Sequence, residues 1–587
     1  MIKAIQLITP ATYVGHGAND GVYYPTGLLT IASQIEKIFT NIKIYIDDQN
    51  VSEIKIRDNT QIVGISIPSP LCYQNVLNFA NTAKKLGKIV VVGEPYATVM
   101  HKLIMRNQPS IKYVIRGKGE NAFVELILNN NHLNYENILG LSYRDGKKIV
   151  HNPNNDQPWS YDSFTPLPLH LLTFGIKKYW NNFNIAYKTK NTKFFQIFTH
   201  FGCTWQKIAE QKRCKKQFPY CSFCALQDEV SERDPESIIT EIKQYIETYH
   251  IPKGTTIVLK DYGDNIGGHK ELLSELNNEI KKHSWWNHYN FNWIMYCQSN
   301  YLTEETAKLL NQIRCSHLFI GFDSVNNKLQ KLNGLGTNRK SHERAIDLCR
   351  RYNIKIQAAS VVGIAGETPE TLEETFQFFK KICLTNIVER VNSAIFFLVP
   401  GSLAWKILAK KVPEINNKDL FSTTELRGLW IKYFCPQVNL EILHKYAIKL
   451  DSLSSGAHTN MGYKNKEKNM SDQQYCPNCN EYYLGFHTSE DCLIHIRYTK
   501  LIKKEKTVKR EIEKLIKKYH NEILTRTENK EQKTFTESAQ DIYIRHYPNA
   551  TKTELNKLIK DTQNKLLKSQ KNKEKNNEQN SHYQDSC

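Results

Sequence analysis

Short β-branched runs alternate with helical segments twice along this chain, and this alternation restricts the fold more than any other feature. The first series has the apolar runs IKAIQLI, IKIYID, IVGISI, KIVVVG and YVIRG. The second begins near residue 192 and has the runs KFFQIFTHFG, TTIVLKDYG, FNWIMYCQS, HLFIGFDS, KIQAASVVGIAG and SAIFFLV. Alternating strands and helices indicate parallel sheets covered by helices. We therefore predict an α/β fold, with an N-terminal Rossmann-like parallel sheet and then a complete or partial (β/α) TIM-type barrel of about six units.

The predicted domains follow from these two series and from shifts in composition. They are a Rossmann-like domain at 1–155, a Pro-, Asn- and aromatic-rich linker at 156–190, the barrel at 191–420, a helical connection at 421–470, a small zinc-type Cys/His module at 471–496 and a basic helical tail at 497–587. The tail ends in KSQKNKEKNNEQNSHYQDSC, a polar stretch that is typical of disorder.

Charge and hydropathy limit where such a chain works. It has 79 Lys+Arg against 59 Asp+Glu, a net charge of +20. No apolar run reaches the roughly 18 residues of a membrane span, and the N-terminus lacks the apolar core of a signal peptide. We therefore expect a cytoplasmic protein without membrane contact. In a reducing cytoplasm its 14 cysteines are expected to be metal ligands or buried thiols rather than disulfides.

Four cysteines lie in one loop directly after the first strand of the second series: Cys203, Cys214, Cys221 and Cys224. Thiolates are soft ligands that suit both zinc and iron–sulfur clusters. Four thiolates close a structural site, whereas three thiolates on a four-iron cluster leave one iron open. The loop follows the C-terminal end of a barrel strand, where barrel enzymes place their chemistry. This location favours a catalytic iron–sulfur cluster over a zinc knuckle.

The loop resembles the cluster loop of radical S-adenosylmethionine (SAM) enzymes. Their usual C-x3-C-x2-C motif follows the first barrel strand and has an aromatic residue before the last cysteine, here Phe223 in CSFC. FGCTW resembles the strand-end form of the first cysteine, so the resemblance implies a 4Fe-4S cluster on Cys203, Cys221 and Cys224, with Cys214 as the alternative first ligand. Four further segments resemble the family in the same order: ERDPESIITEI, LFIGFDS, VVGIAGETPETLEETFQF and FFLVPGSLAW.

This resemblance also implies a mechanism and its site residues. The open iron binds SAM, and one electron from a donor such as a flavodoxin or ferredoxin cleaves it reductively. The resulting radical acts on an unactivated carbon of a small molecule or peptide, or feeds a cobalamin-linked methyl transfer. By position, Asp323 and Ser324 are expected at the ribose or methionyl part and Gly363 at the adenine. Asp261, or alternatively Asp264, stands where the family binds the amino group.

The first series resembles the cobalamin-binding domain that often precedes this barrel, in PTGLLTIAS, IVGISIPS, VVVGEPYAT and VIRGKGENAF. The expected ligand edge of its sheet carries SIPSP (66–70), GEP (93–95) and GKGE (117–120). The D-x-H-x-x-G motif that supplies a histidine to cobalt is absent. The resemblance therefore implies either cobalamin without a protein ligand to cobalt or a domain that keeps the fold without the cofactor.

A second metal site is predicted from Cys476, Cys479, Cys492 and His495, whose spacing is typical of a closed structural zinc module. An auxiliary iron–sulfur cluster is the alternative. The Lys-rich tail after this module leaves two other functions open. One is a radical SAM enzyme that modifies RNA, with the module and the tail holding the RNA backbone. The other is a non-catalytic, zinc-stabilised protein that binds nucleic acid.

Overall fold

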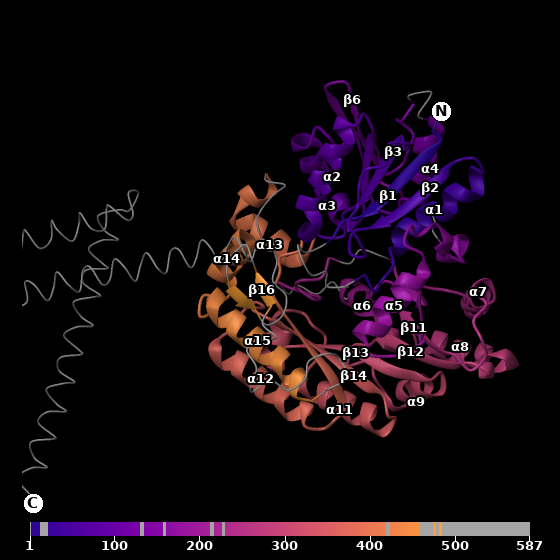
Figure 1. The fold of residues 1–587 in the computed structure, drawn as a ribbon. Helices are drawn as coiled ribbons and strands as arrows, with labels where there is room; N and C mark the ends of the chain where they lie inside the picture. Colours follow the sequence, from indigo (N-terminus) through magenta and orange to yellow (C-terminus); the bar gives the residue numbers. More distant parts are fainter. Residues whose placement is uncertain are drawn as a thin grey trace, which may run out of the picture. The chain divides into compact units, whose positions relative to one another are not determined.

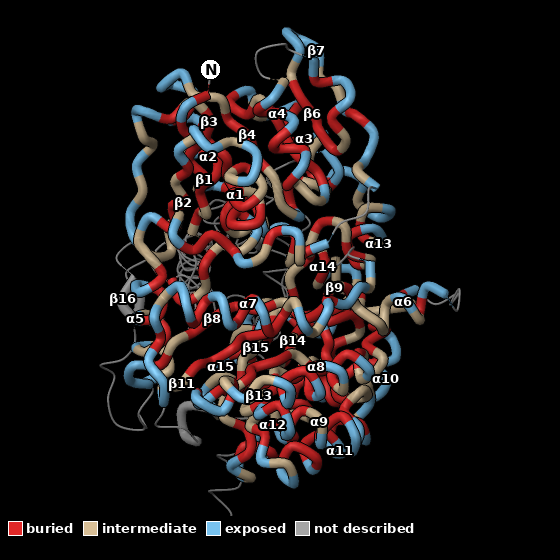
Figure 2. Tube along the Cα trace, turned by 90° about the vertical axis from the view of Figure 1, so that its right-hand side faces the viewer, coloured by how far each residue is buried: buried red, intermediate tan, exposed pale blue. Residues whose placement is uncertain are grey.

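The structure is a computed structural model, which describes residues 2–11, 21–129, 134–156, 160–211, 217–225, 229–417, 423–457, 474–476 and 481–483. Two large sheets make up the described part, and both belong to one compact unit that spans Met1–Tyr475 and Tyr482–Glu490. Figure 2 shows most strands of the two sheets as largely buried, whereas β7 at the edge of the first sheet and many peripheral turns are exposed or intermediate.

The first sheet has the strand order β2-β1-β3-β4-β5-β6-β7, and its first five strands are parallel. This 2-1-3-4-5 order is doubly wound, with a switch point between β1 and β3. Helices α1 and α4 lie on one side of the sheet and α2 and α3 on the other (Figure 1). The elements are β1 (Ala4–Thr9), α1 (Thr26–Ile38), β2 (Lys43–Asp48), β3 (Ile62–Ser66), α2 (Tyr73–Lys85), β4 (Ile89–Gly93), α3 (Pro95–Asn107), β5 (Tyr113–Ile115), α4 (Glu120–Asn129), β6 (Leu141–Asp145) and β7 (Lys148–His151).

The predicted Rossmann-like sheet is present, with an addition. Strands β6 and β7 form an antiparallel hairpin at its edge. Because β7 is short and faces solvent on much of its length, its apolar pattern is too weak to be recognised in the sequence.

The second sheet has six parallel strands in chain order, β8-β11-β12-β13-β14-β15, as expected of a six-unit (β/α) series. Its helices lie along the outer side of the sheet (Figure 1). The strands are β8 (Lys193–Ile197), β11 (Thr256–Asp261), β12 (Asn290–Tyr296), β13 (Cys315–Asp323), β14 (Lys355–Val362) and β15 (Val388–Ile395). The helices are α7 (Pro235–Thr248), α8 (Lys270–Lys282), α9 (Glu304–Gln312), α10 (Asn327–Leu332), α11 (Arg339–Arg351), α12 (Pro369–Cys383) and α13 (Leu403–Lys411).

Local sequence signals set several of these helix boundaries. Thr368 caps α12 by accepting a hydrogen bond from the Thr371 N–H (3.3 Å), and Pro369 occupies the first turn. Asn338 and Ser341 form the reciprocal capping box of α11. The sixth strand begins five residues before the predicted run, because Glu389 and Arg390 interrupt the apolar pattern.

The segment predicted as a linker, 156–190, contains a helix. Helix α5 (Ile176–Ala186) buries Tyr179 and Trp180 between the two sheets. The Tyr179 hydroxyl donates to Asp48 at the end of β2 (3.2 Å), and Trp180 Nε1 donates to the Phe194 carbonyl in β8 (2.8 Å). The segment therefore fixes one sheet to the other.

Two helices follow α13, α14 (Thr423–Phe434) and α15 (Leu440–Ala457), and α15 packs against β15 and α12. Two short strands, β16 (Gln474–Cys476) and β17 (Glu481–Tyr483), pair with each other further along. Among the described residues, no helix is long and apolar enough to cross a membrane. The predictions for residues 484–587 lie outside the described residues.

Candidate active site

The cysteine loop starts at the mouth of the second sheet and is closed at its base by a short ladder. Strand β9 (His200–Phe201) pairs with β10 (Ser231–Glu232), antiparallel, with Phe201 opposite Ser231. Cys203 follows directly and precedes α6 (Thr204–Gln211). The ladder therefore brings the two ends of the loop together at the C-terminal end of β8.

Three predicted ligands share one region of this loop. Cys203, Cys221 and Cys224 are free thiols and each is partly buried. Burial raises the pKa of Cys221 well above its ordinary value, and the charges of Cys224, Asp323 and Cys203 raise it further. Cys221 therefore lies within electrostatic reach of the other two thiols and of Asp323. Cys214 lies outside the described residues.

The three thiols are soft ligands of the kind that hold iron–sulfur clusters. Among the described residues, no group of three His, Cys, Asp or Glu side chains could hold one metal ion. The thiols of a four-iron cluster bind different irons, so they stand farther apart than the ligands of one ion, which lie about 2.3 Å from the same zinc.

A four-residue segment after α10, Asn333–Gly336, forms the platform on which the cysteine loop rests. Asn333 Oδ1 accepts hydrogen bonds from Ser222 Oγ (3.0 Å) and from the Ala365 N–H (3.0 Å). Its Nδ2 donates to the carbonyls of Leu329 and Ala365, both at 2.9 Å. The Asn333 carbonyl also accepts the Ser222 N–H (2.9 Å), so this buried residue ties the C-x2-C turn to the fifth strand.

Two glycines allow the platform to approach the loop closely. Gly334 has φ +66°, and a Cβ there would lie 2.4 Å from the Tyr220 carbonyl oxygen. A Cβ on Gly336 would lie 2.5 Å from the Trp205 ring, whose Nε1 donates to the Gly334 carbonyl (2.9 Å). Only glycine combines this backbone conformation with such close contact.

Asp323, predicted to bind SAM, lies at the end of β13 in a β-bulge with φ +54°. Its carbonyl accepts a hydrogen bond from Ser360 Oγ (2.8 Å), while its carboxyl group makes no hydrogen bond to the described residues. Burial raises the pKa of this carboxyl to about 7. The adjacent Ser324 is fully buried, and its hydroxyl accepts the Asn326 N–H (3.3 Å) within the following turn.

The two aspartates after β11 differ sharply. Asp261 is fully buried and accepts hydrogen bonds from Thr199 N (3.0 Å), Thr199 Oγ1 (2.8 Å) and the Gly263 N–H (2.9 Å). Through these hydrogen bonds, Asp261 holds the chain after β8 against the end of β11. Asp264 is exposed, and its charge raises the pKa of Cys203, so it lies beside the loop. The geometry therefore favours Asp264 over Asp261 as the carboxylate that can reach a ligand.

His200 contacts Gly263 and Asn265, the residues on either side of Asp264. Its Nε2 accepts the Asn265 N–H (3.0 Å), and Nδ1 lies 2.8 Å from Thr199 Oγ1. A Cβ on Gly263 would lie 2.1 Å from the His200 ring, so the two segments are in tight contact. Burial holds the pKa of His200 well below its ordinary value, and the ring is therefore neutral.

Contacts within the fold require a glycine at position 363, whether or not the residue also contacts adenine. It has φ +88°, and the space that a Cβ would fill is taken by Leu443 of α15 at 2.8 Å. Its carbonyl accepts hydrogen bonds from Trp430 Nε1 (2.9 Å) and Cys435 Sγ (3.3 Å). These contacts join the fifth strand to α14 and α15. The adenine contact stays a prediction.

The ligand edge of the first sheet meets the mouth of the second. Tyr24 OH accepts the Gln196 N–H (2.7 Å), and the Tyr23 and Tyr262 rings stand edge to face with centroids 5.7 Å apart. The Lys118 ammonium, in the GKGE segment after β5, lies 5.4 Å from the centroid of the Phe201 ring. The C-terminal ends of strands from both sheets therefore face each other, two residues from Cys203.

The same edge retains room for a ligand. Gly117 has φ +70°, and no heavy atom lies within 4 Å of the place that a Cβ would occupy. Gly27, by contrast, is closed, because a Cβ there would lie 2.5 Å from Glu94 Oε1. An open, left-handed glycine at the end of β5 fits the backbone approach that a large cofactor needs.

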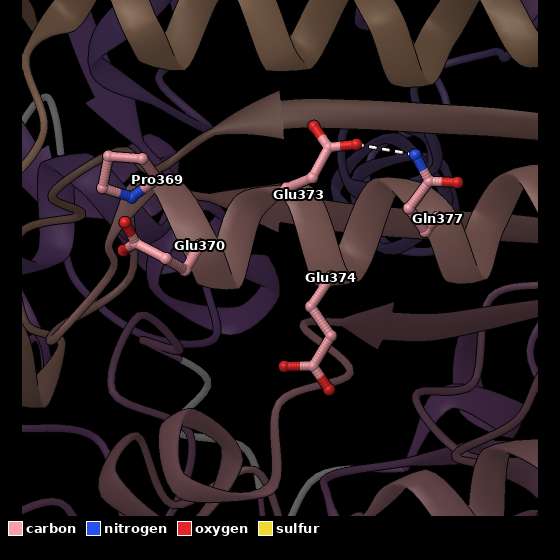
Figure 3. A pocket seen from close by; sticks show the side chains of 5 residues that line it. All are labelled: Pro369, Glu370, Glu373, Glu374 and Gln377. Atoms are coloured by element: carbon pink, nitrogen blue, oxygen red, sulfur yellow. Dashed lines mark hydrogen bonds between the residues drawn. The ribbon is translucent and has the colours of Figure 1, made fainter.

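A surface hollow on α12 lies apart from this region. It is lined by Pro369, Glu370, Glu373, Glu374 and Gln377 (Figure 3). Gln377 donates to Glu373 (2.6 Å), and Glu374 accepts a hydrogen bond from Asn326 (2.7 Å). Because these carboxylates already have partners, the hollow is part of the structural surface of α12.

The second metal site cannot be placed. Only the backbone of Cys476 is described, in β16, and Cys479, Cys492 and His495 lie outside the described residues. The structural zinc and its alternative, an auxiliary cluster, both stay predictions. The RNA-binding role suggested for the module and the tail lies on the same undescribed residues.

Comparison with known families agrees with this geometry. The radical SAM superfamily model matches residues 211–379, and the B12 binding domain model matches residues 17–127. The chain therefore carries a radical SAM domain with a B12-binding domain ahead of it, and it is an enzyme. The superfamily match begins after Cys203, so the first cluster ligand stays a proposal.

Individual relatives are distant. The chain is 22% identical over 390 residues to an uncharacterized methyltransferase, PH0819, of Pyrococcus horikoshii, covering 65% of this chain and 78% of that protein. It is 21% identical over 380 residues to bacteriochlorophyllide d C-12(1)-methyltransferase of Chlorobaculum tepidum, covering 63% and 72%. The fold is similar to that of the radical SAM methyltransferase TsrM from Kitasatospora setae, with a TM-score of 0.52, 17% identity and coverage of 70% and 77%.

Sequence reasoning missed two residues that shape the site. Asn333 and His200 carry no motif that would distinguish them from ordinary polar residues near a turn. The one usable signal was the NGLG sequence, since two glycines so close together after a helix indicate backbone contact.

Proposed function

We propose that this enzyme transfers a methyl group, with cobalamin as carrier, to an unactivated carbon of a small metabolite or peptide. The contact of Lys118 with Phe201 is the observation that carries the proposal. It brings the ligand edge of the B12-binding domain to the residues just before Cys203. A cofactor at that edge would therefore face the mouth of the radical SAM domain. The named methyltransferases among the relatives, and the TsrM structure with cobalamin and a [4Fe-4S] cluster, support the same function.

Cys203, Cys221 and Cys224 would hold the 4Fe-4S cluster, and the segments 66–70, 93–95 and 117–120 would hold cobalamin. When bound, the cluster supplies single electrons to SAM and cobalamin supplies methyl transfer. The chain contributes orientation. Asn333 and the two glycines of the platform fix the cysteine turn.

The exposed carboxyl group of Asp264 and the partly exposed one of Asp323 would bind different parts of SAM. Asp264, beside Cys203, is placed to accept hydrogen bonds from the amino group of SAM. Asp323, beside Cys221 and without a hydrogen-bond partner among the described residues, is placed to accept from a ribose hydroxyl or the methionyl part. A flavodoxin or ferredoxin would deliver electrons near α6, where Lys207, Glu210 and Gln211 are exposed.

The test uses the full chain, purified without oxygen and reconstituted with iron and sulfide. Iron and cobalt are measured per chain, together with 5′-deoxyadenosine and S-adenosylhomocysteine formed from SAM in the presence of a reductant. We expect both metals and both products. A protein that releases 5′-deoxyadenosine but binds no cobalamin and forms no S-adenosylhomocysteine would contradict the methyl transfer and leave the radical SAM class intact. The Cys221→Ala variant is the matched control for cluster-dependent chemistry.

A further inference from the structure

Buried and partly exposed side chains alternate along β13, and this alternation identifies the inner face of the second sheet. Leu318, Ile320 and Phe322 have no exposed surface, because they lie under the outer helices. Phe319 and Asp323, on the opposite face, are partly exposed. The inner face therefore carries partly exposed residues up to the end of β13.

A buried lysine stands on this inner face. Lys260 of β11 lies opposite Ile294 of β12, and its ammonium is 3.7 Å from the centroid of the Tyr296 ring. Tyr262 stands 5.8 Å from the same ammonium. The Tyr296 ring contacts the Phe319 ring, with centroids 5.0 Å apart. Aromatic rings thus surround a cation on β11, the second strand from one edge of the sheet.

Lys260 is a buried cation. It is 4% exposed and forms no hydrogen bond or ion pair with the described residues. The charge of the neighbouring Asp261 favours the ammonium form of Lys260, but the hydrogen bonds of this carboxylate go to Thr199 and Gly263. The face of one aromatic ring offsets only part of the cost of removing an ammonium group from water. Burial accordingly lowers the pKa of Lys260 to about 8.

A second cation reaches the same space from the other edge of the sheet. Arg390 of β15 lies opposite Gln357 of β14 and is partly buried. Its charge lowers the pKa of Tyr23, whose ring stands against Tyr262 beside Lys260. It also lowers the pKa of Asp451, so a carboxylate balances Arg390 in part. One carboxylate therefore acts on each cation, and Lys260 is the more buried of the two.

We propose that the inner face of the second sheet binds a substrate that bears a carboxylate and a planar, conjugated part, with Lys260 as the specificity-determining partner of the carboxylate. The anion would complete the pairing that the fold leaves open at Lys260. The planar part would lie along Tyr262, Tyr296 and Phe319, whose rings favour stacked or edge-to-face contacts. This inference names the substrate class of the proposed methyl transfer and rests on that function for its catalytic meaning.

The binding test is independent of turnover. 2-Naphthoate and 2-naphthamide serve as probes, because they share the planar ring and differ in the charged group. Their affinities for the full-length, anaerobically purified protein are measured by equilibrium dialysis. We expect the acid to bind at least tenfold more tightly than the amide. The Lys260→Met variant should lose that preference, and Lys260→Arg should keep most of it.

A matched control separates this role from packing. Lys193 of β8 also lies over an aromatic ring, 4.6 Å from the centroid of Trp180, and it belongs to the same sheet. Lys193→Met should leave the preference for the acid unchanged. Unfolding midpoints of all variants show whether each protein is folded during the measurement.

Three results would overturn the inference: equal affinity for acid and amide, binding of neither probe, or an unchanged preference in folded Lys260→Met. The proposed function fails separately, because it requires SAM cleavage and cobalamin in the wild-type protein. The Cys221→Ala variant should bind 2-naphthoate as the wild type does while forming no 5′-deoxyadenosine. A naphthoate preference without SAM cleavage would therefore support the site and refute the methyl transfer.

Discussion

Removal of the Asn333 side chain should detach the cysteine loop from the rest of the radical SAM domain. The substitution Asn333→Ala eliminates four hydrogen bonds, two accepted by Oδ1 and two donated by Nδ2. A buried hydrogen bond contributes about 1 kcal/mol net, and a buried group left without a partner costs about 1–3 kcal/mol. The Ser222 hydroxyl and the Ala365 N–H would both lose their partner. We expect a loss of about 4 kcal/mol from the free energy of unfolding, a large part of the roughly 5–15 kcal/mol that is typical of proteins.

The loss should appear first in the loop. Local regions open with less free energy than the whole fold, so iron binding responds before the global transition. Iron per chain after anaerobic reconstitution is the primary measurement, and the urea unfolding midpoint is the second. Asn333→Asp keeps the shape of the side chain but turns its two donors into acceptors that face the Leu329 and Ala365 carbonyls. It should lose iron as Asn333→Ala does, which separates hydrogen bonding from packing.

Asn311→Ala provides the matched control. Asn311 is exposed and donates one hydrogen bond, to the Tyr352 carbonyl (3.0 Å), far from the cysteine loop in sequence. This variant should keep the iron content and the unfolding midpoint of the wild type. Wild-type iron content and an unchanged midpoint in Asn333→Ala would refute the argument that the platform holds the loop.

The remaining predictions concern the ligands, pH and the junction of the sheets. Cys221→Ala should lose the iron–sulfur absorbance. The same change at a buried cysteine of α11, Cys349→Ala, should keep this absorbance. An equal loss in both variants would point to misfolding rather than to a lost cluster ligand. Burial raises the pKa of Glu367 from 4.5 to about 7, so the unfolded state releases its proton first and stability falls as pH rises between those values, by about 3 kcal/mol at most. Glu367→Gln should flatten that dependence in urea titrations at several pH values, and an unaltered slope would contradict the assignment. Tyr24→Phe leaves the Gln196 N–H without its acceptor and should lower the unfolding free energy by about 1–3 kcal/mol, measured by urea denaturation; no loss would show that the junction is not stabilised by this bond.

The sequence alone determined the two α/β series, because each buried strand is a short apolar run and each helix has its own period and cap. Thr368 illustrates this: the capping residue was recognisable in GIAGET, and it begins α12 as the pattern indicates. The superfamily could also be identified from the sequence, since its motifs lie in short, ordered segments. Apolar patterns did not locate the start of β15, because polar and charged groups on an inner face interrupt the pattern that marks a strand.

Only the tertiary structure decided how the site is built. Asp261 and Asp264 are three residues apart, and nothing in their local sequence shows that the first is saturated with hydrogen bonds and the second is exposed beside Cys203. Asn333 lies more than a hundred residues from Ser222, which it holds. The aromatic surroundings of Lys260 depend on strands from distant parts of the chain. Burial and pairing are properties of contacts between distant segments, and local sequence patterns do not record them.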